Sequence, residues 1–372
     1  MKIAIITFHR AYNCGALLQA WALKTVLERM GHTVEFPILN HVGETKRWLM
    51  KWGKWSNNPL RVVRSVIYRG LYNLMSIPAQ DILRHRYNNF RINYLPEREI
   101  TADELGNYYD AIVVGSDQVW SVKHSGKDAP IFFAENIPDC IRKIAYAASY
   151  GDKPLDNCAV GRVVDSLQRF SDISVREQFA QLQLSKYTSK PIEVTLDPTL
   201  LLSAADYMSI ETRIRNKNRP YLFMYTLTAE PFFINIARQL ANRLGVRCVI
   251  APCYQYTKFA APKGLTFSLS PDRLLGLIHD AKYVLAASFH GTALSVLYNK
   301  PFLSLRAQED IYESRPSSFL NLLGCKKRLV NPSTSLNRMV ELLKEEIPLS
   351  CHEKLEKERA KSLAWLKKCC KN

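Results

Sequence analysis

The sequence predicts an α/β protein built from two Rossmann-like domains that face each other across a cleft. Two observations favour this fold class. Apolar runs short enough to be buried strands alternate with amphipathic helices, once before about residue 202 and again after residue 220. The chain of 372 residues is also longer than a domain with a single core usually is, since domains usually run to about 100 to 200 residues.

The expected domains follow from this alternation. Residues 1–202 form an N-terminal Rossmann-like domain with a basic helical insertion at about 41–100. Residues 203–348 form a C-terminal Rossmann-like domain, and residues 349–372 a C-terminal basic helix. The charged run from Arg213 to Pro220 is typical of a boundary between domains.

The chain opens with a β-α-β unit. Strands are expected at 2–8 and 33–39, with a helix at 16–30 between them that Gly31 ends. In the loop before the helix, Asn13 and Gly15 tolerate positive φ angles, so backbone amides there could meet an anion. The loop lacks the glycine spacing of a dinucleotide or Walker motif.

Residues 46–91 contain ten Lys or Arg and one acid, Asp81, with Trp48, Trp52 and Trp55 interleaved. One interpretation is an amphipathic surface that docks on an anionic membrane, where indole rings favour the interface. The other is a solvated helical hairpin that covers the first domain. Nucleic-acid binding is disfavoured because no recognition module accompanies the charge.

Later strands of the first half end in polar residues. The strand at 109–114 runs into Gly115, Ser116, Asp117 and Gln118, at the carboxyl edge where ligands collect in parallel sheets. Strands at 143–149 and 172–177 follow. Arg176 either pairs with an acid such as its neighbour Glu177 or clamps a carboxylate or phosphate.

The strand at 192–196 stops at Asp197 and Pro198. Asp is a favoured N-cap residue and Pro a favoured first helical residue, so Asp197 is interpreted as structural.

The second half repeats the alternation, with strands at 221–227, 246–251, 283–287 and 302–305 and helices at 231–244, 271–279, 292–298, 336–346 and 353–368. The turn after the third of these strands holds His290, which would meet unpaired amides at the start of the next helix. Gly291 lets the backbone approach a ligand. The alternative is a histidine that caps or packs the turn.

Composition narrows the function classes. Hydrophobic content of 47% and charged content of 23% are ordinary for a globular protein. The sequence has no apolar run of about 18 residues that could span a membrane. The pattern of residues 1–8 is typical of a strand and not of a signal peptide. We therefore expect a cytoplasmic protein. Nine scattered cysteines without a C-x-x-C pair indicate reduced thiols. The net charge of +17 implies attraction to phosphates of nucleic acid, lipid or small molecules.

Six motifs in order resemble the polysaccharide pyruvyl transferase family: 7–9 with 13–20, 115–120, 146–151, 174–177, 196–201 and 288–293. The resemblance covers residues 1 to about 330. It implies a fold like that of the GT-B glycosyltransferases, and transfer of pyruvate from phosphoenolpyruvate (PEP) to a sugar as a ketal. Such a reaction belongs to the synthesis of bacterial capsule or exopolysaccharide.

The resemblance also implies site residues. Arg176 looks like the family's donor-binding arginine and His290 like its active-site histidine. Ser288 departs from the pattern, because many members carry an arginine two residues before the histidine. Either Ser288 shares the role of that arginine with another cation, for which Arg306 and Arg315 are the nearest candidates, or the donor is held differently.

Ketal formation requires an acid to protonate the enol carbon of PEP, a cationic clamp and a base for the sugar hydroxyl. We expect His290 to be the acid or phosphate ligand, Arg176 the clamp and Asp117 the base. Because protein cations can neutralise the donor, no metal and no cofactor besides the donor are expected. The residues expected to contact substrates are Asn13, Gly15, Gly115, Ser116, Gln118, Ser288, Gly291, Thr292 and Arg306.

Two other functions are compatible with the sequence. One is a GT-B-type glycosyltransferase that uses a nucleotide sugar, and the other a non-catalytic anion-binding protein associated with a membrane. The sequence names neither the acceptor sugar nor its carrier, a lipid diphosphate or a nucleotide. A lipid carrier would place the enzyme at the inner face of the membrane.

Overall fold

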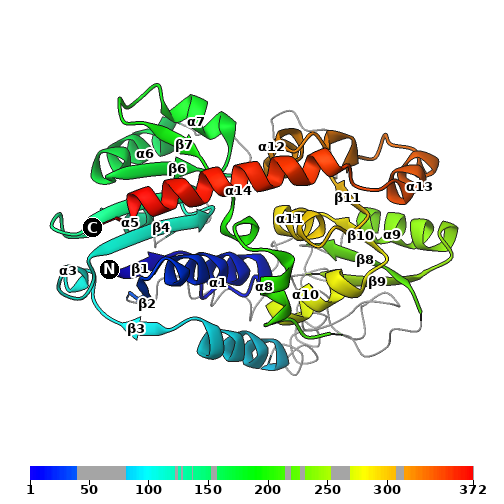
Figure 1. Ribbon diagram of the computed structural model, residues 1–372, viewed down its shortest axis with the longest axis horizontal. Helices are drawn as coiled ribbons and strands as arrows, with labels where there is room; N and C mark the ends of the chain where they lie inside the picture. Colours follow the sequence, from blue (N-terminus) through cyan, green and yellow to red (C-terminus); the bar gives the residue numbers. More distant parts are fainter. Residues whose placement is uncertain are drawn as a thin grey trace, which may run out of the picture.

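The computed structural model describes residues 1–39, 81–121, 125–126, 129–135, 137–151, 157–213, 219–226, 231–252, 269–306 and 314–371. They form two α/β units, each built on a parallel sheet (Figure 1). The basic insertion expected at 41–100 lies outside the described residues up to residue 80. From there a helix covers residues 81–94.

The first sheet has seven strands in the order β3-β2-β1-β4-β5-β6-β7, and every neighbouring pair is parallel. Ile3 to Ile6 of β1 lie opposite Ala111 to Val114 of β4 at the centre, where both strands are buried. Burial on both faces explains why these strands are continuous apolar runs. The strands are β1 (Lys2–Ile6), β2 (Thr33–Ile38), β3 (Glu97–Glu99), β4 (Ala111–Asp117), β5 (Arg142–Ala148), β6 (Asp172–Val175) and β7 (Ile192–Val194).

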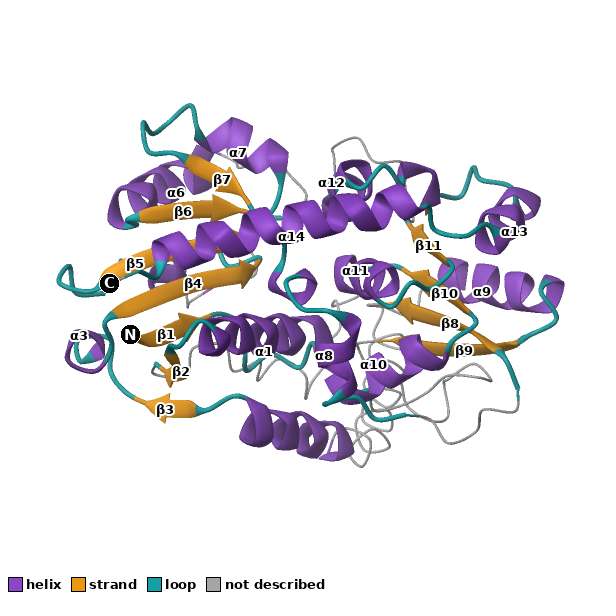
Figure 2. Ribbon diagram, viewed as in Figure 1, coloured by secondary structure: helices purple, strands orange, loops and turns teal. Residues whose placement is uncertain are grey.

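The helices of this unit cover both faces of the sheet (Figure 2). Asn13 caps the first of them by accepting from the backbone N–H groups of Gly15 and Ala16, and Gly31, with φ of 89°, follows its last turn. The helices are α1 (Cys14–Arg29), α3 (Leu105–Tyr108), α5 (Ala129–Phe132), α6 (Asn157–Arg169), α7 (Gln178–Leu184), η3 (Pro198–Leu200) and α8 (Ala204–Met208).

The second sheet has five parallel strands in the order β12-β11-β10-β8-β9. These strands are β8 (Tyr221–Thr226), β9 (Arg247–Pro252), β10 (Tyr283–Ala286), β11 (Phe302–Leu305) and β12 (Leu329–Val330). Its helices are α9 (Pro231–Arg243), α10 (Pro271–Asp280), α11 (Phe289–Leu297), α12 (Arg315–Leu322), η4 (Lys326–Arg328) and α13 (Leu336–Lys344). The prediction of two α/β units with parallel sheets is confirmed.

The strands of the two sheets point toward each other, as the arrowheads of β4, β6, β8 and β10 show in Figure 2. Polar residues after the strands of both units therefore converge between the sheets, where parallel α/β proteins bind ligands. An apolar cluster joins the units: Leu17 and Leu18 of α1, Leu200 of η3, and Ala293 and Leu294 of α11 belong to one buried core.

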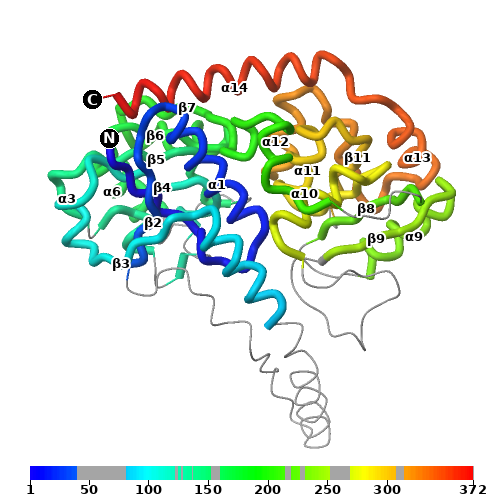
Figure 3. The backbone as a smooth tube through the Cα atoms, turned by 60° about the horizontal axis from the view of Figure 1, so that its bottom comes forward, coloured from blue at the N-terminus to red at the C-terminus, as the bar shows by residue number. Residues whose placement is uncertain are grey.

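Helix α14 (Leu349–Cys369) runs along both units (Figure 3). It begins beside α12 and ends at the first sheet, where the Trp365 and Tyr146 rings lie 6.0 Å apart. The Ser362 hydroxyl accepts from the backbone N–H of Leu196 at 3.0 Å, and the Arg359 guanidinium donates to the carbonyl of Leu200 at 2.7 Å. The C-terminal helix thus ties the second unit back to the first.

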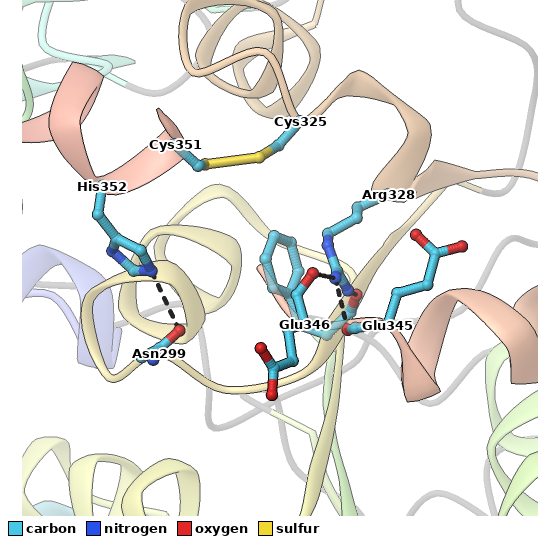
Figure 4. The surroundings of a disulfide bond; sticks show 8 residues. Asn299, Cys325, Arg328, Glu345, Glu346, Cys351 and His352 are labelled. Atoms are coloured by element: carbon cyan, nitrogen blue, oxygen red, sulfur yellow. Dashed lines mark hydrogen bonds between the residues drawn. A yellow bond between two sulfur atoms is a disulfide. The ribbon is translucent and has the colours of Figure 1, made fainter. Parts of the chain in front are cut away.

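Two cysteines differ from the expectation of nine reduced thiols. Cys325, after α12, is bonded to Cys351 in the first turn of α14 (Figure 4). Beside them, the buried Arg328 guanidinium donates to the carbonyls of Phe302, Leu342, Glu345 and Glu346. Because the two cysteines are 26 residues apart, no local spacing in the sequence signals the pair.

Candidate active site

The site is centred on Arg176, which follows β6 and is buried beneath the cleft. Its guanidinium lies 2.6 Å from Asp197, 3.2 Å from Glu177 and 3.6 Å from Asp117. The other face of the group stacks on the Phe289 ring of the second unit, 4.7 Å from its centroid. A planar, permanently charged group suits this position because it can serve several carboxylates and an aromatic face at once.

Asp197 is the second centre of the site. One carboxylate oxygen caps η3 by accepting from the backbone N–H and the hydroxyl of Thr199. The other accepts from Arg176 and from the Ser116 hydroxyl at 3.2 Å, and it lies 3.6 Å from Nε2 of His290. Asp197 is therefore a cap, as its sequence predicts, and also a link among three strands and the second unit.

His290 lies in the first turn of α11, which begins at Phe289, three residues earlier than expected. Its ring packs against Gly15 of the first unit, where an added Cβ atom would come within 2.2 Å of Nδ1. Only glycine fits this position without moving the imidazole. His290, which the sequence predicts as the active-site histidine, thus faces the opposite unit at the start of α1.

Three buried polar atoms at this site have no hydrogen-bond partner among the described residues: Nη2 of Arg176, Oε2 of Glu177 and Nε2 of His290. Buried polar groups are nearly always paired, and an orphan in a native protein calls for an explanation such as a ligand or bound water. Here two donors or acceptors come from the first unit and one from the second. Their convergence indicates a place built to receive a polar molecule.

The protein environment shifts the pKa values of the three buried carboxyl groups in different directions. Burial raises the pKa of Glu177 despite the nearby guanidiniums of Arg176 and Arg315. Burial also works against ionised Asp117 and Asp197, but His290 and Arg176 outweigh it and hold the pKa of both carboxyls below its usual range. The site therefore combines two firmly ionised carboxylates with one carboxyl that retains its proton to higher pH.

The carboxyl end of β4 is fixed by a polar network that the sequence did not reveal. Gln19 of α1 donates to the Thr7 hydroxyl and accepts from the Ser116 N–H, while Thr7 donates to the Ser116 carbonyl. Ser116 is fully buried, and its hydroxyl, with one proton to donate, lies within hydrogen-bond distance of both the Asp197 carboxylate and the Ala147 carbonyl. This network aims Asp117, at φ of 75°, into the site.

Gly115 and Gln118 lie on either side of Ser116 and Asp117. Gly115 has φ of 119°, and a Cβ atom there would lie 2.1 Å from the carbonyl oxygen of Tyr146. The buried Gln118 side chain lies near Gly151. Both residues therefore lie at the carboxyl edge of β4, as expected.

Several residues expected to contact substrates have structural partners. Ser288 caps α11 by accepting from the Gly291 N–H, and Asn13 caps α1. Gly291 packs closely on Tyr225, and the Thr292 hydroxyl bonds the Ser288 carbonyl and the Ser304 hydroxyl. Their expected substrate contacts stay predictions.

Of the two cations considered as replacements at position 288, the structure brings Arg315 into the site. It is the first residue of α12, and its guanidinium lies 3.9 Å from Asp117. Arg306 directly follows β11 at the carboxyl edge of the second sheet, and its backbone N–H donates to the Val330 carbonyl.

Among the described residues, no group of three or more His, Cys, Asp or Glu side chains is placed to hold a metal ion. Within the same residues, every helix is too short or too polar to cross a bilayer.

Solved structures share this architecture at low sequence identity. UDP-GlcNAc 2-epimerase from Methanocaldococcus jannaschii, in complex with UDP-GlcNAc and UDP, matches 93% of this chain and 94% of its own with 12% identity and a TM-score of 0.50. A putative UDP-N-acetylglucosamine 2-epimerase from Listeria monocytogenes matches 96% and 90% with 10% identity and a TM-score of 0.50. E. coli heptosyltransferase WaaC matches 92% and 96% with 13% identity and a TM-score of 0.36.

The fold is thus of the GT-B class, with a buried, charged site between two parallel-sheet units. Within that class, the family model for polysaccharide pyruvyl transferase matches residues 13–308, and the chain belongs to this family. No curated protein matches the sequence. The family model spans Asp117, Arg176 and His290.

Proposed function

We propose that this protein transfers pyruvate from PEP to two hydroxyls of a sugar as a ketal, during synthesis of a bacterial cell-surface polysaccharide. The observation that carries the proposal is the convergence of the orphaned Arg176, Glu177 and His290 atoms inside a chain of this family. The guanidiniums of Arg176 and Arg315 lie beside Asp117, and the imidazole of His290 lies beside Asp197. Cationic groups gathered in this way favour a small anionic donor.

His290 is the proposed acid. Its proton goes to the CH₂ carbon of PEP, which becomes a methyl group and leaves a cation at C2. A sugar hydroxyl adds to C2 and releases its proton, the C2–O bond to phosphate breaks, and a second hydroxyl closes the ketal. Of the two protons that the diol loses, one restores His290 and the other leaves with phosphate, so the reaction balances.

Arg176 is the proposed clamp for the donor carboxylate, through its Nη2 group, which makes no hydrogen bond to a described residue and lies 3.6 Å from Asp117. Arg315 adds a second cation at the entrance from α12. Asp117 is the proposed base, ionised and oriented by the polar network at the carboxyl end of β4. Glu177 is a second candidate because its raised pKa makes it the stronger base once ionised.

The acceptor is proposed to be carried on a lipid diphosphate, which would bring the enzyme to the inner face of the membrane from the cytoplasm. The support is the basic, tryptophan-containing sequence between residues 46 and 91. No cofactor besides the donor is proposed.

The test is incubation of purified protein with PEP and a panel of lipid-linked and nucleotide-linked sugars, read out by phosphate release and product mass. The expected product is heavier than the acceptor by one pyruvate ketal. A parallel arm with nucleotide sugars and no PEP addresses the alternative suggested by the fold. Glycosyl transfer in that arm, without ketal formation in the first, would contradict the proposal.

A further inference from the structure

A pocket of about 240 Å³ lies beside Arg176, and His290 is not among the residues that line it. Its walls come from β7 and α7 in the first unit, from α12 in the second, and from α14, which crosses between them. Arg176, Asp197, Phe289 and Arg315 line it and also belong to the candidate active site. The pocket therefore adjoins the reacting groups and has room of its own.

The chemistry of its wall differs from that of the active site. Gln178, Ser318 and Asn321 contribute neutral polar groups, and Phe289 and Phe319 contribute aromatic rings. A wall that combines amides and hydroxyls with aromatic faces suits a ligand with many hydroxyls and some apolar C–H surface.

Charge on the wall is mixed. Asp197 and Glu358 contribute carboxylates and Arg176, Arg315 and Lys361 contribute cations, of which Arg176 is bonded to Asp197 and Lys361 lies 3.7 Å from Glu193. The volume is below the roughly 300 to 1,000 Å³ of sites for drug-sized ligands, so it suits a single ring.

We infer that this pocket between α7, α12 and α14 binds one uncharged sugar ring of the acceptor and presents its hydroxyls to the donor across Arg176. The inference rests on the proposed function, which it deepens by separating the sugar from the donor. It also explains why α14 lies where it does, since that helix supplies one wall of the pocket.

The test fills the pocket. Leu322 lines it and is 40% exposed, so Leu322→Trp places an indole at its mouth without disturbing a core position. The matched control is Leu182→Trp, on α7, at a residue that is 62% exposed and does not line the pocket. Thermal melting checks that both variants fold. Asn321→Ala is a milder second variant, which removes one amide from the wall.

The probes are PEP, followed by calorimetry, and p-nitrophenyl hexosides and N-acetylhexosaminides, followed by saturation-transfer NMR. We expect at least one hexoside to bind the wild type and Leu182→Trp, to lose about tenfold or more in affinity with Leu322→Trp, and to lose about fivefold with Asn321→Ala. PEP should bind all four proteins equally.

Retained hexoside binding by Leu322→Trp, or loss of PEP binding in its place, would overturn the pocket assignment. So would a wild type that binds PEP but none of these sugars, a result that leaves the proposed function standing. Failure of the proposed function is recognised separately, because the wild type would then neither bind PEP nor transfer pyruvate.

Discussion

The imidazole of His290 rests on the backbone of Gly15, with no room between them for a methyl group. Gly15 belongs to the first turn of α1 and His290 to the first turn of α11, so this contact joins the starts of two helices from different units. The position of the proposed acid is therefore set by a residue without a side chain.

Gly15→Ala should displace His290 and lower pyruvyl transfer by about 100-fold, since a shift of about 1 Å in a catalytic group can cost that much. Initial rates with saturating PEP measure the effect. The control is Gly161→Ala on α6, where an added Cβ meets nothing within 4 Å and alanine favours the helix. Equal activity of the two variants would contradict the positioning role.

His290→Gln keeps a hydrogen-bonding side chain of similar reach but cannot deliver a proton near neutral pH. We expect it to bind PEP and to transfer pyruvate about 10² to 10⁴ times more slowly than wild type. His290→Ala should fold and still bind the donor. Activity near wild type in the Gln variant would leave His290 a binding role only, and full activity in the Ala variant would remove it from the mechanism.

Arg176→Lys keeps the charge but loses the planar fork that reaches Asp197, Glu177 and Asp117. Each lost charge-assisted hydrogen bond should lower the free energy of unfolding by about 1.5 to 3 kcal/mol. We also expect a large rise in KM for PEP, measured beside urea unfolding. A stability loss with unchanged KM would show that Arg176 serves the ion pairs alone.

Stability should depend on pH through Glu35, away from the site. Hydrogen bonds from Arg98, opposed by partial burial and helped by Tyr109, lower the pKa of Glu35 to about 2. A lowered pKa stabilises the fold above the unfolded value of about 4.5, and this contribution disappears as pH falls toward 2. Glu35→Gln should therefore melt below wild type at pH 7, with a difference that shrinks between pH 4.5 and 2.

Glu28→Gln is the matched control for that series, because it removes one carboxylate from an exposed pair with Lys24. Its melting temperature should stay near that of wild type at pH 7. A Glu35→Gln difference that persists unchanged at pH 2 would refute the linkage.

Binding to anionic vesicles tests the membrane proposal. Each Lys or Arg near such a surface contributes about 1 kcal/mol, so co-sedimentation should be strong at low salt and weaken as ionic strength rises. Neutral phosphatidylcholine vesicles are the comparison. Equal partitioning to both kinds of vesicle would exclude an electrostatic contact.

Sequence patterns predicted the long elements because their signal is local. The strand at 302–305 has the expected bounds. Helices α9 and α10 begin at the expected residues, and each ends within one residue of its expected end. Helices α7 and α12 and strand β3 were not predicted. The two helices have seven and eight residues, which is too short for a helical period to stand out, and β3 has only three residues.

The site was predictable where residues follow strands, as Asp117 and Arg176 do. Asp197 was assigned a single role because its cap is complete within three residues of chain, while its contacts with Arg176 and His290 come from tertiary folding. Gln19 gave no signal, since a polar residue inside a helix resembles an exposed one until its partners are known.

The path of α14 has a consequence for how the chain acquires its structure during synthesis. Leu355 and Leu366 of this helix belong to the same buried core as residues near the start of the chain, and Lys371 accepts a hydrogen bond from Arg142 of the first sheet. The first unit therefore emerges from the ribosome with an uncovered apolar flank. That flank stays open until residues 349–371 have been made, so a nascent chain stalled before them would offer chaperones a binding surface that the finished fold conceals.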